Sequence, residues 1–403
     1  MATDRSSAGS VGLRSPRRRR RSLADVVDVG LPFDPVLAFA AVALTIASCM
    51  AIAGATTGNA FVVRQVAYGI VGIGVAAVVS RIDYARWQAI RWPLYAFMVG
   101  SIVAVAVLGQ KVNGSTLSIN LGFFSFQASE LGKVLVAVVA AAFIVDRRSV
   151  VHTWTTTAGV LLLVVVPAGL TADFGSSLVY GAIALAILLI GGTPGRHLAT
   201  IGITGVVVVV AVFGVLPAVG APVLKGYQLD RITAFLSPNS DHKVEPGQID
   251  ARYQLKQAKA AIGSGQKTGR GNNATQQTLG YLPEQQTDFI FASAGERYGF
   301  VGVAAILSLF ALIMWRGLRI LSTARDFYGA VLAAGILAML LFQVLVNAGM
   351  NVGIMPITGI PLPLVSYGGS SVLSTYLAIG LLQAIYAQGR AAARRGPTVD
   401  RTD

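Results

Sequence analysis

Charged residues are scarce in this chain: Asp, Glu, Lys and Arg supply 12% of its 403 residues, whereas hydrophobic residues supply 54%. A soluble domain carries about 25% charged residues, so this composition excludes an ordinary soluble enzyme. Apolar runs of roughly 20 residues, each long enough to cross a ~30 Å hydrocarbon core, recur from Pro35 almost to the C-terminus. Because backbone groups in lipid need internal partners, we predict an all-α polytopic membrane protein with about ten transmembrane helices.

Cysteine and histidine are almost absent. Cys49 is the single cysteine, which excludes a disulfide framework and a cysteine-based metal site. The three histidines, His152, His197 and His242, show no ligand spacing, which disfavours a histidine metal site but leaves open one that the fold assembles. Long apolar runs in place of short alternating strands disfavour an outer-membrane barrel.

The distribution of basic residues predicts the topology. Residues 1–31 contain the run Arg17 to Arg21, which indicates a disordered cytoplasmic tail more than a nucleic-acid-binding arm. Counted from that tail, every short basic loop falls on one side of the membrane. The positive-inside rule then places both termini in the cytoplasm, with a transmembrane domain over residues 32–389 and a basic C-terminal tail over residues 390–403.

One long polar connection, residues 220–286, precedes the eighth predicted span and is extracytoplasmic by this count. Its basic character predicts an anionic partner. Within it, Asp250 is expected to cap a helix that ends at Gly263, with Arg252, Lys256 and Lys259 beside an apolar face. Such a helix suits the outer membrane surface, where its cations serve either a lipid-linked diphosphate or anionic headgroups alone. The glycines that follow favour a hinge or lid over a phosphate cradle.

Asp288 is the leading catalytic candidate. It stands at the start of the eighth apolar run, where an ionised group is costly unless it has a task. Glu130 and Lys133 lie one helical turn apart at the start of the fourth span. This pair is either a structural salt bridge or a site where Lys133 holds a diphosphate that Glu130 orients.

Two arginines and an irregular segment complete the candidate site. Arg64 lies inside the second span and either faces the bundle or extends toward the outer surface. Arg231 is a candidate for gripping a phosphate or carboxylate, or else a solvated loop charge. Residues 355–371 combine three prolines with small hydroxyl residues, which predicts an irregular cavity wall. The predicted substrate-binding residues are Arg231, Lys133, Glu130, Arg64, Thr358, Ser366 and Ser370.

Two motifs carry a resemblance to a known family. The chain contains LPEQQTDFIFASAGERYGFVG from Leu282 and PITGIPLPLVSYGGSS from Pro356. Together with FQASELGK, ADFGSSL and YQLKQAKAAIGSG, they resemble the SEDS family (shape, elongation, division and sporulation), and they are more similar to its elongation members, RodA, than to its division members, FtsW. The resemblance covers nearly all of the chain after the Arg-rich tail.

This resemblance implies an enzyme class and its partners. SEDS proteins are peptidoglycan glycosyltransferases that polymerise lipid II into nascent glycan on the outer face of the cytoplasmic membrane. They work with a single-span class B penicillin-binding protein. Asp288 matches the family's proposed catalytic aspartate, which suits a general base in an inverting displacement of polyprenyl diphosphate. The leaving diphosphate needs cationic stabilisation, from Arg and Lys or from a divalent cation such as Mg²⁺ or Mn²⁺.

The chain departs from the family pattern at several positions. Gln286 stands where His is usual, Ala128 where Pro is usual, and Thr171-Ala172 where Gln-Pro is common. The usual Arg-Trp pair is missing between Gln110 and Asn120. These changes bear on the positioning of substrate, whereas the presence of Asp288 with Glu130 and Lys133 favours an active protein.

Two other functions fit parts of the sequence. A flippase of lipid-linked cell-wall precursor also uses charged residues inside spans, but it concentrates them near the membrane midplane. Most candidates here lie toward the outer face instead. A scaffold that only positions a penicillin-binding protein would not require Asp288, and the basic outer loop beside that residue disfavours it.

Overall fold

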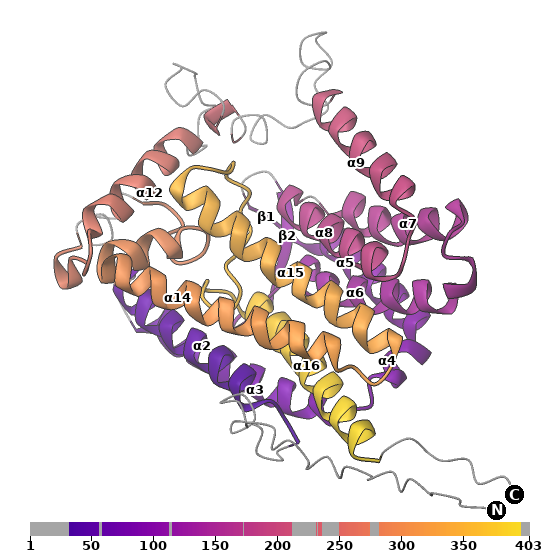
Figure 1. Ribbon diagram of the computed structural model, residues 1–403. Coiled ribbons are helices and arrows are strands. Elements are labelled where there is room, and N and C mark those ends of the chain that lie inside the picture. The colour runs from indigo at the N-terminus through magenta and orange to yellow at the C-terminus, as the bar shows by residue number, and fades with distance from the viewer. Residues whose placement is uncertain are drawn as a thin grey trace, which may run out of the picture. The chain divides into compact units, whose positions relative to one another are not determined.

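The computed structural model describes residues 32–55, 59–112, 115–171, 173–211, 231, 233–235, 250–274 and 282–395. Its longer helices are α2 (Pro35–Ala55), α3 (Ala60–Ser80), α5 (Arg91–Leu108), α6 (Ala128–Asp146), α7 (Trp154–Leu170), α8 (Phe174–Ile190), α9 (Gly195–Val210), α12 (Ala251–Gly265), α14 (Ile290–Ser322), α15 (Phe327–Val352) and α16 (Gly369–Arg395). A short helix, α4 (Ala85–Ala89), and two 3-10 turns, Arg148–Val150 and Gly271–Asn273, connect some of them (Figure 1). The predicted Arg-rich tail, residues 1–31, and about half of the predicted loop over residues 220–286 lie outside the described residues.

The prediction of an all-α polytopic membrane fold is confirmed. Among the described residues, seven helices are long and apolar enough to cross a membrane, namely α2, α3, α5, α6, α14, α15 and α16. The other three expected spans are the apolar helices α7, α8 and α9, which have 17, 17 and 16 residues. The last span is longer than predicted, because α16 continues through residues 390–395, which were assigned to the tail.

A small sheet between α5 and α6 was not predicted. Strands β1 (Gln110–Val112), β2 (Ser115–Asn120) and β3 (Ser125–Phe126) pair antiparallel in that order. The sequence between β1 and β2 is Asn113-Gly114, which is among the strongest short signals for a hairpin. That dipeptide is the signal from which the hairpin could have been predicted.

Aspartates start several of the helices. Asp34 precedes Pro35, and its Oδ1 accepts the N–H groups of Val36 and Leu37, both at 3.0 Å. Asp173 caps α8, Asp250 caps α12 and Asp326 caps α15 in the same way. Each carboxylate satisfies N–H groups that have no partner within the helix and complements the positive end of its dipole. The role of helix capping expected for Asp250 is confirmed.

Helix α6 lies inside the bundle, where it packs against α5, α7, α8, α15 and α16. Figure 1 shows α14 beside α2 and α15 crossing near α8, and the helices of each pair are in contact. Helices α3 and α16 also pack together, because Gly72 leaves room for the ring of Tyr376. Small residues at such contacts let the helix backbones approach closely, which is how membrane helices gain packing energy.

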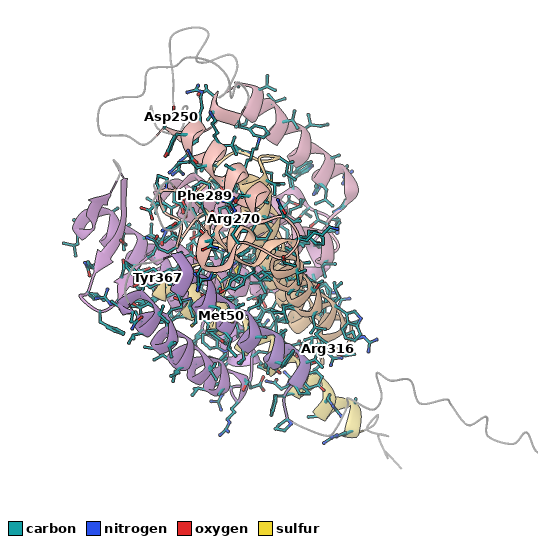
Figure 2. The ribbon with its side chains drawn as sticks, turned by 90° about the vertical axis from the view of Figure 1, so that its left-hand side faces the viewer. Met50, Asp250, Arg270, Phe289, Arg316 and Tyr367 are labelled. Atoms are coloured by element: carbon teal, nitrogen blue, oxygen red, sulfur yellow. The ribbon has the colours of Figure 1, made fainter. Side chains whose placement is uncertain are left out.

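The short basic connections gather at one end of the bundle. Arg325 Nη2 lies 3.5 Å from Asp83 Oδ1, which joins the α14–α15 connection to the segment after α3. Arg91 pairs with Asp146 at 2.5 Å, which joins the start of α5 to the end of α6. Figure 2 shows Arg316 toward this end and Asp250, Arg270 and Phe289 toward the other. The predicted sorting of basic loops to one side therefore agrees with the arrangement of the helices.

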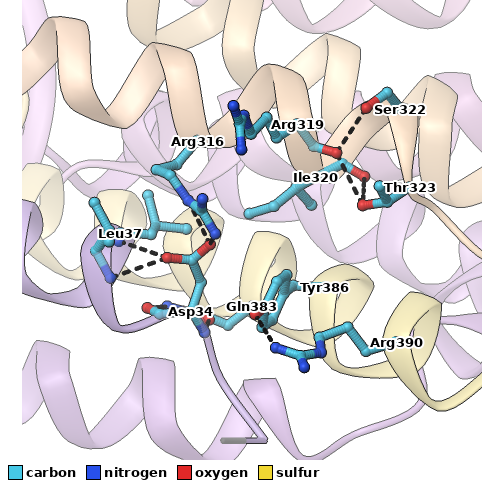
Figure 3. Close-up of polar contacts among 11 residues, drawn as sticks. Asp34, Leu37, Arg316, Arg319, Ile320, Ser322, Thr323, Gln383, Tyr386 and Arg390 are labelled. Carbon is cyan, nitrogen blue, oxygen red and sulfur yellow. Dashed lines mark hydrogen bonds and ion pairs between the residues drawn. The ribbon is translucent and has the colours of Figure 1, made fainter. Parts of the chain in front are cut away.

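A buried ion pair fixes the start of α2 at that basic end. Arg316 Nε donates to Asp34 Oδ2 at 2.7 Å, and Asp34 is fully buried (Figure 3). Gln383 of α16 completes the contact: its Oε1 accepts the Asp34 N–H at 2.6 Å and its Nε2 donates to the Asp34 carbonyl at 2.9 Å. One aspartate thus joins α2, α14 and α16.

Candidate active site

Asp288 lies in a turn, residues 282–289, that leads directly into α14. Two hydrogen bonds attach this turn to the irregular segment between α15 and α16. Ser366 Oγ donates to the Thr287 carbonyl at 2.6 Å, and the Tyr367 N–H donates to the Gln286 carbonyl at 2.8 Å. The predicted irregular wall therefore packs against the segment that carries the candidate base.

Arg231, Asp288 and Gly359 meet at one point. A Cβ atom built on Gly359 would lie 3.2 Å from Arg231 Nη1 and 3.4 Å from Asp288 Oδ2. Gly359 has a φ of +73°, a conformation that L side chains rarely adopt. A glycine therefore both makes the turn and leaves room for the guanidinium and the carboxylate. The structure thus brings together two of the residues singled out in the sequence.

The surroundings of Asp288 favour its protonated form. Burial raises the pKa of the Asp288 carboxyl to about 6; the nearby Arg231 guanidinium opposes this shift, and the charges of Glu284 and Asp173 add to it. Some of the residue's surface remains accessible, so the group is half-buried instead of sealed off. A carboxylate with a pKa near 6 is a stronger base than an ordinary aspartate and is still mostly ionised at neutral pH.

Glu130 and Lys133 form a buried ion pair in the first turns of α6. Lys133 Nζ donates to Glu130 Oε1 at 2.6 Å, and the two side chains are 1% and 3% exposed. Beside them the Tyr180 hydroxyl of α8 donates to the Ser129 carbonyl at 3.1 Å. Of the alternatives left open by the sequence, the salt bridge is present, and substrate binding by Lys133 stays a prediction.

The hydroxyl residues of the irregular segment hold main-chain groups. Ser366 Oγ also accepts the Leu362 N–H at 2.8 Å. Ser370 Oγ donates to the Ser125 carbonyl at 2.7 Å and accepts the Gln127 N–H at 2.9 Å, which ties α16 to the start of α6. Thr358 is buried, and its carbonyl lies against Gly175 in the first turn of α8. All three positions shape the wall, and their contact with substrate stays a prediction.

Arg64 lies on the exposed surface of α3. It is not among the described residues whose charges act on Asp288. Its guanidinium is 5.9 Å from the centre of the Phe123 ring, which belongs to the turn between β2 and β3. Phe123 and Tyr367 each pack against Tyr68 in turn. Arg64 therefore belongs to an aromatic cluster that ends at Tyr367, next to the Asp288 turn.

Helix α12 ends two residues later than predicted, at Gly265 instead of Gly263. Its apolar face is covered by protein: Leu255 and Ala258 belong to the same buried cluster as Phe289 and Met350. The expectation that this face lies on the membrane surface is therefore wrong, because the start of α14 and the end of α15 occupy that face. Lys256 is exposed, as expected for the cationic side.

Two of the four glycines at and after the end of α12, Gly265 and Gly269, pack tightly against α14, whereas Gly263 and Gly271 face open space, so the expected hinge or lid stays a prediction. Gly265 contacts the Gly295 carbonyl so closely that no side chain would fit, and Gly269 contacts the backbone at Gly299. Gly299 interrupts α14 with a φ of 65°. The N–H of Phe300, released by this break, donates to the Gln266 carbonyl at 2.9 Å. Gly265 and Gly269 thus allow the backbone at the end of α12 to approach the backbone of α14 more closely than a side chain would permit.

Sequence reasoning missed Asn347 and Asn351 of α15, whose amides donate to the Asp288 carbonyl. A signal was present, since two amides one turn apart inside an apolar span need partners. A metal-binding cluster was not found in the described part of the chain, where no group of three His, Cys, Asp or Glu residues could hold an ion.

Comparisons with known proteins identify the family. A family profile described as "Cell cycle protein", which covers FtsW, RodA and SpoVE, matches residues 33–391. The chain belongs to this family. The SEDS resemblance is thus confirmed, and family membership fits the multi-pass membrane fold.

Relatives named MrdB (RodA) and relatives named FtsW are both similar to the chain. It is 34% identical to the "Peptidoglycan glycosyltransferase MrdB" of Escherichia coli K12, over 88% of this chain and 93% of that protein. It is also 34% identical to the "Probable peptidoglycan glycosyltransferase FtsW" of Hahella chejuensis, over 86% and 87% of the two chains. The predicted enzyme class agrees with both names, but the equal identities do not separate a RodA-like from an FtsW-like member.

Solved structures share the fold. A chain from the work described as "Structural coordination of polymerization and crosslinking by a peptidoglycan synthase complex" aligns with a TM-score of 0.75 and 27% identity, over 89% of this chain and 99% of that one. The rod shape determining protein RodA of Thermus thermophilus aligns with a TM-score of 0.64 and 24% identity, over 88% and 97%.

Proposed function

We propose that this protein is a peptidoglycan glycosyltransferase that polymerises lipid II on the outer face of the cytoplasmic membrane, with Asp288 as general base. The observation that carries this proposal is the meeting of Asp288, Arg231 and Gly359 at the end of the bundle opposite the basic loops. With both termini in the cytoplasm, that end faces outward. The relatives named as peptidoglycan glycosyltransferases support the same reaction.

The proposed chemistry is a single displacement at a sugar carbon. Asp288 takes the proton of the acceptor 4-hydroxyl as its oxygen attacks the anomeric carbon of the donor. The bond from that carbon to the polyprenyl diphosphate breaks, the diphosphate leaves with the electron pair, and the anomeric configuration inverts. Arg231 is placed to stabilise the charge of the diphosphate, since its guanidinium can bind phosphate oxygens in bidentate fashion.

A divalent cation is part of the proposal. Mg²⁺ or Mn²⁺ is often held by one or two carboxylates together with substrate phosphates, so the ion is expected to bind together with the diphosphate of the substrate. When bound, the ion would neutralise negative charge on the leaving group. Chelation is therefore expected to slow polymerisation and added Mg²⁺ or Mn²⁺ to restore it.

Further parts of the proposal concern role and partners. The RodA-like segments favour a role in cell elongation, and lipid II, nascent glycan and membrane lipids are the expected molecular partners. A class B penicillin-binding protein is the expected protein partner. The similarity to a chain of a complex described as coordinating polymerisation and crosslinking supports this pairing.

The decisive experiment is glycan polymerisation from lipid II by the purified protein, with and without a class B partner and a divalent cation. Polymer from the wild type but not from Asp288→Ala, at equal amounts of folded protein, is the expected result. Full activity in Asp288→Ala would refute the assignment of the base. If neither protein makes polymer with all components present, a lipid-flipping assay tests the alternative of a precursor flippase.

A further inference from the structure

Two asparagines on α15 hold the main chain at Asp288. Asn347 Nδ2 donates to the Asp288 carbonyl at 3.0 Å, and Asn351 Nδ2 donates to the same oxygen at 3.2 Å. The two residues lie one turn apart on α15, and both are 0% exposed. Burying an amide in an apolar helix costs free energy unless it is hydrogen-bonded, and the Asp288 carbonyl is an acceptor that both amides share.

The same amides reach two other segments of the site. Asn347 Nδ2 also donates to the Ile360 carbonyl at 2.8 Å, directly after the glycine that faces Arg231 and Asp288. Asn351 Oδ1 accepts the Ala292 N–H in the first turn of α14 at 3.1 Å. Asn351 Nδ2 donates in addition to the Asn347 carbonyl at 2.8 Å. One network therefore fixes the Asp288 turn, the start of α14 and the segment around Gly359 relative to one another.

We propose that Asn347 and Asn351 are positioning residues that set the place and direction of the Asp288 carboxylate for proton transfer. The inference rests on the proposed function, in which Asp288 is the base. A base must come within about 2.6–3.2 Å of the proton it takes. A displacement of about 1 Å costs on the order of 100-fold in rate. Two donors from α15 hold the Asp288 carbonyl in place. The carboxylate of the same residue therefore keeps its position relative to the Arg231 guanidinium.

The helix also offers a matched control. Gln343 lies one turn before Asn347 on the same buried face of α15 and is 2% exposed. Among the described residues it makes no hydrogen bond to the Asp288 turn. Replacing it with a group of similar volume removes a buried amide from α15 without touching the network at Asp288.

The test compares Asn347→Leu and Asn351→Leu with Gln343→Met, using the full chain with the partner and cation that support polymerisation. We expect kcat to fall at least about 10-fold in each asparagine variant, while KM for lipid II changes less than about twofold. The midpoint of the pH–rate profile should also rise, because a displaced carboxylate loses part of the effect of Arg231. Gln343→Met should lower the melting temperature without either change. Wild-type kcat in both asparagine variants would overturn the proposal. It would also be overturned if kcat fell equally in all three variants and the midpoint of the pH–rate profile did not move.

Two additions keep the outcome interpretable. Asn347→Ala removes the amide donor without adding an ionisable group, so it replaces Asn347→Leu if that variant does not fold, with the same expected and contrary results. Asp288→Ala is measured alongside. Activity in that variant overturns the proposed function itself, whereas an inactive Asp288→Ala beside asparagine variants of normal kcat overturns only the positioning role.

Discussion

Lys133 Nζ lies 2.6 Å from Glu130 Oε1, and both side chains are almost completely buried at the start of α6. Removing water from two charges costs several kcal/mol, and their attraction offsets that cost only while both are present. Deleting one partner leaves the other charge buried alone, which destabilises a protein by about 3–5 kcal/mol. This asymmetry provides a way to separate a structural role from a role in substrate binding.

We expect Lys133→Met to unfold at a markedly lower temperature than the wild type, and Glu130→Gln/Lys133→Met to regain most of the loss. If Lys133 also holds the diphosphate, the double variant folds but its KM for lipid II stays at least several-fold raised. Thermal unfolding and steady-state kinetics on both variants give the answer. A double variant with wild-type KM would leave the pair a structural salt bridge only.

Activity should depend on the ionisation of Asp288. Burial raises the pKa of its carboxyl to about 6, and Arg231 limits the shift. A general base works only when deprotonated, so the rate should rise with pH through about 6 and level off above about 7. The charge of Glu284 adds to the raised pKa of Asp288, so Glu284→Gln should move the midpoint to lower pH. A pH–rate profile whose midpoint lies near 4 would contradict the assignment.

The same pKa shift makes a prediction about stability. Because the folded-state pKa of Asp288 lies above its unfolded value near 4, the folded protein binds this proton more tightly, and stability falls as pH rises from about 4 to 6. Asp288→Asn removes this cost, which is at most about 3 kcal/mol for a shift of roughly two units. The variant should therefore melt at a higher temperature than the wild type at pH 8 and show a smaller advantage at pH 4. An equal difference at the two pH values would exclude the shift as its cause.

Gly359 should be intolerant of a side chain for two separable reasons. Its φ of +73° strains any L residue by about 1–2 kcal/mol, and its Cβ would crowd Arg231 and Asp288. Gly192 shares a positive φ of +88° but faces open space beyond the other end of α8. Gly359→Ala is expected to lower both stability and kcat, and Gly192→Ala only stability, in unfolding and polymerisation assays. Equal kcat in the two variants would show that the site tolerates the extra methyl group.

The position of Asp288 directly before α14 and the helices around it could be predicted from the sequence, because those depend on local rules. Asp288 stood at the edge of an apolar run, and Asp250 preceded an amphipathic stretch, so both the carboxylate and the capped helix were foreseeable. What packs against a given apolar face could not be predicted in the same way. The apolar face of α12 has the same pattern whether it meets lipid or protein, and only the fold shows that Phe289 and Met350 cover it.

The hydrogen bonds from Asn347 and Asn351 to the Asp288 carbonyl could not be predicted from the sequence for a related reason. Asn347 follows Asp288 by 59 residues, and nothing local to either position indicates that an amide of one span meets a carbonyl at the start of another. The pairing of Arg231 and Asp288 across Gly359 likewise depends on the path of the chain between α15 and α16. Local patterns identify which groups need a partner, whereas the identity of the partner follows from packing.

The ion pair of Asp34 with Arg316 should affect stability alone. It lies at the end of α14 opposite Asp288, and Arg316→Met leaves a fully buried carboxylate without its main cation, at a cost of about 3–5 kcal/mol. Arg319→Met is the matched control, since the Arg319 guanidinium lies over the Trp315 ring, 4.5 Å from its centre. We expect a large fall in melting temperature for Arg316→Met, a small one for Arg319→Met, and wild-type kcat per folded molecule in both. A fall in kcat of folded Arg316→Met would instead mean that the basic end of the bundle is coupled to the Asp288 turn through α14.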